Sequence, residues 1–175
     1  MLLLSPGLRR WFLPSVALLA TLVVWGAIRY PRLPDLIPGH IGIDGVDAWA
    51  ERSFGSAFTP VLIYAGVTVV MAACAEMTLR ITPRDELPVG AGPFAGGLPP
   101  SPPHRPGSRA SARRMARALL VLNACIGLSF LAGCAALWHT APGQEPPVWL
   151  PPAALGPLLV GTVLTVAAAL TGRKR

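Results

Sequence analysis

The sequence predicts an all-α integral membrane protein with four transmembrane helices. Of its 175 residues, 53% are hydrophobic and only 13% are charged, and the mean hydropathy is +0.54. Soluble domains carry about 25% charged residues, so the expected solvent for most of this chain is a lipid bilayer. Four apolar stretches reach the length of about 17–25 residues that a membrane-spanning helix requires.

These stretches cover residues 11–28, about 58–79, about 118–138 and about 152–171. None of them holds a charged residue at its centre. Because backbone groups in lipid must find hydrogen-bond partners within their own segment, each stretch is expected to be a helix.

The basic residues alternate between the two sides of this arrangement. Twelve of the 15 Lys and Arg residues precede the first helix, lie between the second and third helices, or close the chain. The other three, Arg29, Arg32 and Arg52, lie between the first two helices. Since basic loops remain in the cytoplasm, we expect a multi-pass protein of the cell membrane with both termini cytoplasmic. The same placement argues against nucleic-acid binding, despite a formal net charge of +7.

A polar segment joins the first two helices and holds most of the chemistry of the chain. Its prolines disfavour a helical conformation in the residues before them, while Asp44 and Gly45 favour a turn. We expect the turn to fold the segment back so that Asp47 and Trp49 approach His40. The candidate ligand- or partner-binding residues of this loop are Pro34, Asp35, Pro38, His40, Asp47 and Trp49.

Three roles remain open for this loop. His40 oriented by Asp47 is suited to hold a proton or a metal ion, although a metal site needs more ligands than these. The two side chains could instead bond to each other and to the loop backbone, closing a lid over the helix ends. Thirdly, the loop could bind a peptide or lipid partner with Trp49 and Phe54 as anchors. We expect no metal or cofactor and no catalytic residue, because the sequence holds no known catalytic or cofactor motif.

Two polar residues within the spans are also candidates, because polar groups at membrane depth are often functional. Glu76 lies near the end of the second helix, four residues before Arg80, which favours an ion pair at the interface over a proton relay. Asn123 in the third helix is expected to form a hydrogen bond across a helix contact.

Residues 81–117 are predicted to be a cytoplasmic linker that ends in a basic run. From residue 87 to 108 the chain is rich in Gly, Pro, Ala and Ser, which predicts a disordered tether or a polyproline II ligand. Arg109, Arg113 and Arg117 then repeat every four residues, on one helical face, and should attract anionic lipid headgroups. The linker separates an N-terminal unit, residues 1–80, from a two-helix hairpin, residues 118–175.

The polar loop resembles the family named domain of unknown function 1648, whose bacterial membrane proteins include the SdpI-type toxin-immunity proteins. The matching residues are Leu33, Pro34, Asp35, Ile37, Pro38, His40, Gly45, Asp47, Trp49 and Pro60. Arg52 stands where the family tends to have Lys, and the resemblance is limited to the N-terminal half. It implies a small multispanning bacterial membrane protein that carries this motif on an extracytoplasmic loop.

We therefore expect a non-enzymatic protein that acts in envelope sensing, immunity or regulation by binding an unknown protein or peptide through this loop. The competing hypothesis is a small transporter, or a subunit of one, that uses His40 and Glu76 as polar stations.

Overall fold

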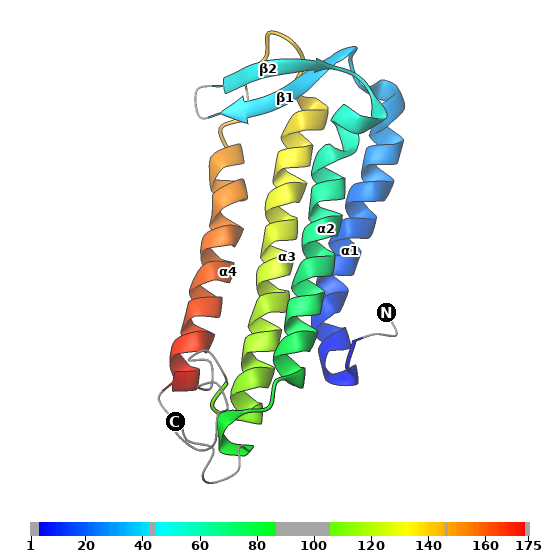
Figure 1. Cartoon of the computed structure of the whole chain (residues 1–175). Coiled ribbons are helices and arrows are strands. Elements are labelled where there is room, and N and C mark those ends of the chain that lie inside the picture. Colours follow the sequence, from blue (N-terminus) through cyan, green and yellow to red (C-terminus); the bar gives the residue numbers. More distant parts are fainter. Residues whose placement is uncertain (1–3, 43–44, 87–105, 146, 174–175) are drawn as a thin grey trace, which may run out of the picture.

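The computed structural model describes residues 4–42, 45–86, 106–145 and 147–173. Within these ranges, four long helices carry a two-stranded sheet at one end (Figure 1). The elements are α1 (Pro6–Arg29), β1 (Leu36–Gly42), β2 (Gly45–Glu51), α2 (Phe54–Arg80), α3 (Arg109–His139) and α4 (Leu150–Arg173), with the short 3₁₀ helices η1 (Tyr30–Arg32) and η2 (Arg84–Glu86).

Each of the four long helices in the described part of the chain is long and apolar enough to cross a membrane. This confirms the predicted helical membrane class and makes the chain a small multi-pass membrane protein. The sequence did not predict the strands of the polar loop. The disorder predicted for residues 87–108 falls almost entirely outside the described residues.

Serine caps decide where two of the helices begin. Ser53 and Ser56 form a reciprocal capping box at the start of α2, in which each side chain accepts a hydrogen bond from the backbone N–H of the other. The Ser108 side chain accepts a hydrogen bond from the backbone N–H of Ser111. Because such caps satisfy N–H groups that lack a partner in the first turn, α3 begins at Arg109 and includes the whole basic run.

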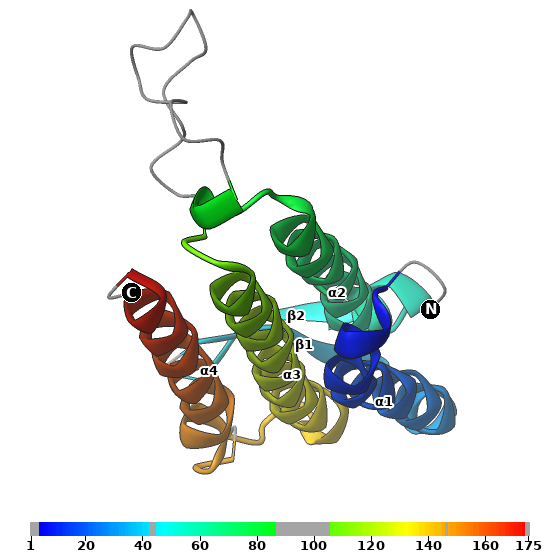
Figure 2. The same cartoon turned by 90° about the horizontal axis from the view of Figure 1, so that it is seen from below.

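Helix α3 is the centre of the bundle. Viewed along the bundle, α4 lies on one side of α3, and α1 and α2 lie on the other (Figure 2). Gly161 allows the close approach of α4, since a Cβ atom at this position would lie 2.9 Å from Leu122 Cδ1 and from Cys125 Cβ. The Ser129 hydroxyl also donates to the Ala154 carbonyl oxygen across this contact, at 2.6 Å. The outward face of α4 leaves leucine and valine side chains exposed, as a lipid-facing helix should.

Aromatic side chains fill the core beneath the sheet. Trp138 of α3 is 2% exposed and donates its indole N–H to the Ala57 carbonyl oxygen at 3.2 Å. Trp25 of α1 meets the Trp138 ring edge-on, with ring centroids 5.2 Å apart. Gly26 makes this packing possible, because a Cβ atom there would lie 2.9 Å from the Trp138 ring.

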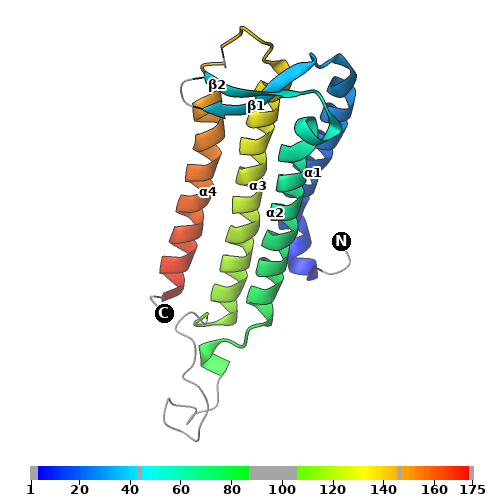
Figure 3. The same cartoon turned by 45° about the horizontal axis from the view of Figure 1, so that its top comes forward.

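The hairpin of β1 and β2 lies across the ends of the helices, opposite the two chain termini (Figures 1 and 3). We call this the hairpin end of the bundle, and the opposite end the arginine end. At the arginine end, the backbone N–H groups of Arg84 and Asp85 donate to the carbonyl oxygens of Pro106 and Gly107, at 3.1 and 3.3 Å. The described residues on either side of the segment 87–105 are therefore bonded to each other.

Candidate functional site

The hairpin is anchored to the bundle by its first strand. Ile37 is fully buried, Leu33 just before the strand is 4% exposed, and Pro38 is also buried. β1 contacts both α2 and α3. His40, Asp47 and Trp49 of the same hairpin, by contrast, are exposed. The apolar residues of the motif thus hold the hairpin in place, while its polar residues remain open to solvent.

Irregular strand pairing positions Asp47 beside His40. The two strands are antiparallel, with His40 opposite Ala48 and Ile41 opposite Val46, so Asp47 has no partner in the register. Gly39 is left over on β1 in the same way. An extra residue of this kind re-aims the neighbouring side chains, which here brings the Asp47 carboxylate to the imidazole.

His40 and Asp47 form a side-chain hydrogen bond in which Nδ1 lies 2.7 Å from Oδ2. The sequence prediction that Asp47 approaches His40 is correct. The pair is open to solvent, since the side chains are 69% and 52% exposed. Gly42 makes room for the carboxylate, because a Cβ atom at Gly42 would lie only 2.7 Å from Asp47 Oδ2. Trp49 lies opposite Pro38 in the register, with 37% of its surface exposed.

Arg52 closes the base of the hairpin. Its guanidinium donates to the Leu33 carbonyl oxygen at 2.6 Å and lies 3.3 Å from the Asp35 carboxylate. Its backbone N–H donates to the Asp35 carbonyl oxygen at 2.8 Å. Asp35, a predicted site residue, is thus held beside Arg52 at the hairpin base, apart from the His40–Asp47 pair. Sequence reasoning noted Arg52 only as a family feature and missed this contact.

An apolar groove runs beneath the exposed pair. Its volume is about 330 Å³. It lies between β1 residues 38–41, Pro60 of α2, and the α3 side chains of Phe130, Cys134 and Leu137. The groove therefore offers an apolar surface directly beside the polar hairpin residues, which suits a ligand with both kinds of group.

A second histidine lies at the hairpin end and was not singled out from the sequence. Arg29, at the end of α1, donates to the Trp138 carbonyl oxygen at 3.1 Å and lies 3.2 Å from His139 Nδ1. Because a guanidinium only donates, His139 Nδ1 acts as the acceptor in this contact. The arrangement ties α1 to the end of α3.

Asn123 forms the predicted hydrogen bond across a helix contact. Its side-chain amide faces Thr68 of α2, with Nδ2 at 3.3 Å and Oδ1 at 3.4 Å from the threonine hydroxyl. The nearby Tyr64 hydroxyl donates to the backbone carbonyl oxygens of Ser15 and Asn123 at 3.4 Å. This buried group joins α1, α2 and α3 in the middle of the bundle.

Glu76 has the predicted neighbour Arg80 and a second partner that the sequence did not indicate. Arg80 Nε lies 3.6 Å from the Glu76 carboxylate. The carboxylate also accepts the backbone N–H of Ser5 at 3.2 Å and the Ser5 hydroxyl at 2.9 Å. Since Ser5 precedes α1, Glu76 lies at the positive end of that helix dipole.

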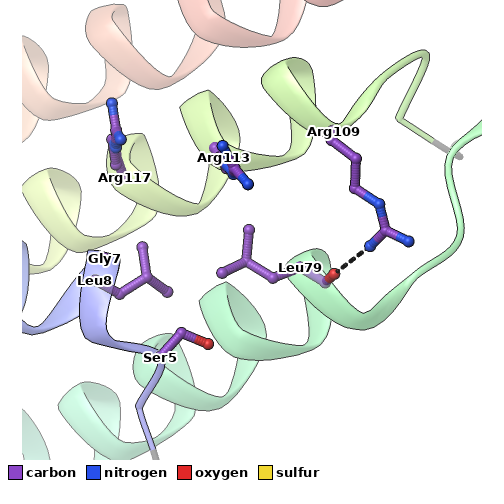
Figure 4. Close-up of a pocket in the computed structure, with 7 residues that line it drawn as sticks. All are labelled: Ser5, Gly7, Leu8, Leu79, Arg109, Arg113 and Arg117. Carbon is purple, nitrogen blue, oxygen red and sulfur yellow. Dashed lines mark hydrogen bonds between the residues drawn. The ribbon is translucent and has the colours of Figure 1, made fainter.

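Three arginines of the basic run, Arg109, Arg113 and Arg117, lie on successive turns of α3 and border a cavity at the arginine end (Figure 4). Arg109 is bound by the Glu86 carboxylate through two hydrogen bonds of 2.7 Å, and it also donates to the Leu79 carbonyl oxygen at 3.1 Å. Its charge is therefore balanced locally. The Arg117 guanidinium lies 5.8 Å from the centre of the Trp11 ring.

The site and the fold define a small multi-pass membrane protein with a capping hairpin between its first two helices. Residues 17–64, which carry the hairpin, match the family model described as domain of unknown function (DUF1648). No curated protein and no solved structure significantly matches the chain. Among the described residues, no three His, Cys, Asp or Glu side chains come together as a metal-binding group.

Proposed function

We propose that this protein is a non-enzymatic regulator of the cell envelope that binds a protein or peptide partner through its hairpin. The observation that carries the proposal is the exposed His40–Asp47 pair on a hairpin that is anchored to the bundle by the buried residues Ile37 and Pro38. Envelope sensing, immunity and regulation share this requirement for binding a partner outside the membrane.

The hairpin is suited to binding because its base is already fixed. Ile37 and the Arg52 contacts hold both strands there, so a partner need not fix this part of the hairpin, and the entropic cost of association is reduced. The partner we propose bonds to the His40–Asp47 pair and contacts Trp49, a residue type common at interface hot spots. An apolar side chain of the same partner enters the groove beneath β1.

The proposed location of this surface is extracytoplasmic. The loop that contains the hairpin holds three Lys or Arg residues, whereas the segments at the opposite end of the bundle hold twelve. By the positive-inside rule, the arginine end faces the cytoplasm. The termini are then cytoplasmic, and the hairpin of this cell-membrane protein meets partners outside.

Photo-crosslinking in native membranes tests the proposal. A photoreactive amino acid replaces Trp49, and a matched control carries it at Val69, which is 69% exposed on α2. We expect a discrete protein or peptide adduct from position 49 and only lipid adducts from position 69. Lipid adducts alone from both positions would contradict partner binding.

Substitutions at the pair give a second test. His40→Ala and Asp47→Ala should each abolish the adduct without changing the amount of protein in the membrane. Glu145→Ala is the control, because Glu145 is an exposed acid in the loop between α3 and α4. Unchanged capture by both hairpin variants, or proton-dependent flux in proteoliposomes that is lost in Glu76→Gln, would instead favour the transporter hypothesis.

A further inference from the structure

A cavity at the arginine end carries charge that the proposed partner binding does not use. It has a volume of about 340 Å³ and lies between the start of α1, the end of α2 and the first turns of α3 (Figure 4). This is within the range of about 300–1,000 Å³ that is usual for ligand pockets. Its described lining includes Arg109, Arg113 and Arg117, and no acidic residue.

The carboxylates near this cavity are bound to other groups. Glu86 is held by Arg109 through two hydrogen bonds of 2.7 Å. Glu76 is bound to Ser5, with Arg80 at 3.6 Å. In the described part of the chain, no carboxylate lies within ion-pair distance of Arg113 or Arg117. The cavity therefore retains two positive charges without a counter-ion.

Arg117 also retains a donor without an acceptor. Its Nε atom is buried and has no hydrogen-bond partner among the described residues, as is also true of Arg29 Nε and Arg114 Nε, but only Arg117 of these three lines the cavity. A buried N–H group is normally bonded, and an unpaired one calls for an explanation such as a missing ligand. A phosphate oxygen would satisfy it, because the guanidinium fork matches the geometry of phosphate oxygens.

Apart from Ser5, the residues that line the rest of the cavity are apolar. Leu8 of α1 and Leu79 of α2 line it opposite the arginines (Figure 4). Gly7 adds no side chain, and no atom lies within 4 Å of the position that its Cβ would occupy. A ligand with an anionic head and an apolar body would fit this combination of walls. The cavity lies where three helices that are long and apolar enough to span a membrane begin or end.

We propose that this cavity binds the phosphate headgroup of an anionic phospholipid, with Arg113 and Arg117 as the contacting cations. Arg109 is a positioning residue, which joins the start of α3 to Glu86 and to the end of α2. The bound lipid holds α1, α2 and α3 together at the arginine end. This site is independent of the hairpin at the opposite end of the bundle.

Native mass spectrometry of the full-length protein tests this site. The purified protein is titrated with phosphatidylglycerol or with phosphatidylcholine, and the bound lipid is counted. We expect one retained phosphatidylglycerol and no retained phosphatidylcholine. Each arginine near an anionic membrane surface contributes about 1 kcal/mol, so Arg113→Gln and Arg117→Gln should each weaken retention about fivefold.

Arg114→Gln is the matched control, because it removes the same charge from the same run but lies outside the cavity lining. Equal losses in the control and in Arg113→Gln would overturn the proposal in favour of general surface charge. A third arm adds inorganic phosphate alone. If millimolar phosphate displaces the lipid, or if both lipids are retained equally, the site does not recognise a lipid headgroup. Thermal unfolding of every variant checks that the helices remain assembled.

Discussion

Glu76 of α2 accepts hydrogen bonds from both the backbone N–H and the hydroxyl of Ser5, a residue 71 positions earlier in the chain. The contact joins the start of α1 to the end of α2 at the arginine end. Direct contacts between these two helices are otherwise fewer than those that each makes with α3. The carboxylate therefore acts as a cap supplied by another helix.

Loss of this cap should destabilise the protein. Hydrogen bonds to charged groups contribute about 1.5–3 kcal/mol, so Glu76→Ala should lower the free energy of unfolding by roughly that amount. Glu76→Gln should cost less, because its amide oxygen still accepts from Ser5. Unfolding in detergent, followed by tryptophan fluorescence, measures both, with Glu145→Ala as the control. Equal losses in the Ala and Gln variants would show that hydrogen bonding by the side chain contributes nothing.

Two glycines of the helices should respond in opposite ways to alanine. A Cβ atom at Gly127 would overlap the Tyr64 hydroxyl, whereas at Gly66 no atom lies within 4 Å. Overpacking of a core costs about 1–3 kcal/mol, so Gly127→Ala should lower stability by that amount, and Gly66→Ala should leave it unchanged or raise it by up to ~1 kcal/mol. The same unfolding assay measures the stability of both variants. A stable Gly127→Ala variant would mean that α2 and α3 are farther apart than described.

The hairpin offers a test of the His40–Asp47 geometry that changes neither residue. Gly42→Ala would place a Cβ atom 2.7 Å from Asp47 Oδ2 and displace the carboxylate, whereas Gly39→Ala meets its nearest neighbour, the Ala48 carbonyl oxygen, at 3.4 Å. We expect crosslinking from position 49 to fall at least as far in Gly42→Ala as in Asp47→Ala. Gly39→Ala, which leaves the carboxylate in place but adds a methyl group to the groove lining, should retain more of the signal than Gly42→Ala. If both glycine variants retained the crosslinking signal, partner binding would not depend on the position of the Asp47 carboxylate.

Arg52 should control the order of the hairpin. Arg52→Ala removes the bond to the Leu33 carbonyl oxygen and the ion pair with Asp35, so we expect faster cleavage of the loop by an external protease. Arg52→Lys retains a charge for Asp35 but cannot span both acceptors as the guanidinium does, and should be intermediate. The cleavage rate in intact cells measures the effect. Asp35→Ala removes only the ion pair and so separates its effect from that of the bond to the Leu33 carbonyl oxygen. If Arg52→Ala were cleaved no faster than the unchanged protein, Arg52 would have no role at the base of the hairpin.

The sequence was sufficient to predict the four helices because a segment that spans a lipid bilayer must be long, apolar and internally hydrogen-bonded. Hydropathy alone located all four helices, although their ends were decided by local caps such as Ser53 and Ser108. The prolines and glycines of the polar loop also indicated a fold-back that brings Asp47 to His40. The pairing of β1 and β2 was missed because this segment lacks the apolar alternation that marks strands.

Contacts between distant residues were beyond the reach of the sequence. Glu76 was assigned to Arg80, four residues away, because spacing on one helix is visible in a sequence, whereas the position of Ser5 depends on how α1 packs against α2. Likewise, Glu86 and Arg109 are 23 positions apart, and no periodic pattern relates them. The charge balance of the basic run therefore emerged only from the fold.

The backbone bonds from Arg84 to Pro106 and from Asp85 to Gly107 bring the chain back to the place where it left. These bonds hold the end of α2 near the start of α3, whatever the length of the polypeptide between them. Because a connection tolerates insertion better when the flanking backbone is fixed, a fluorescent reporter with adjacent termini is expected to be accepted there. Such a fusion would report on this protein in living cells without touching either the hairpin or the helices.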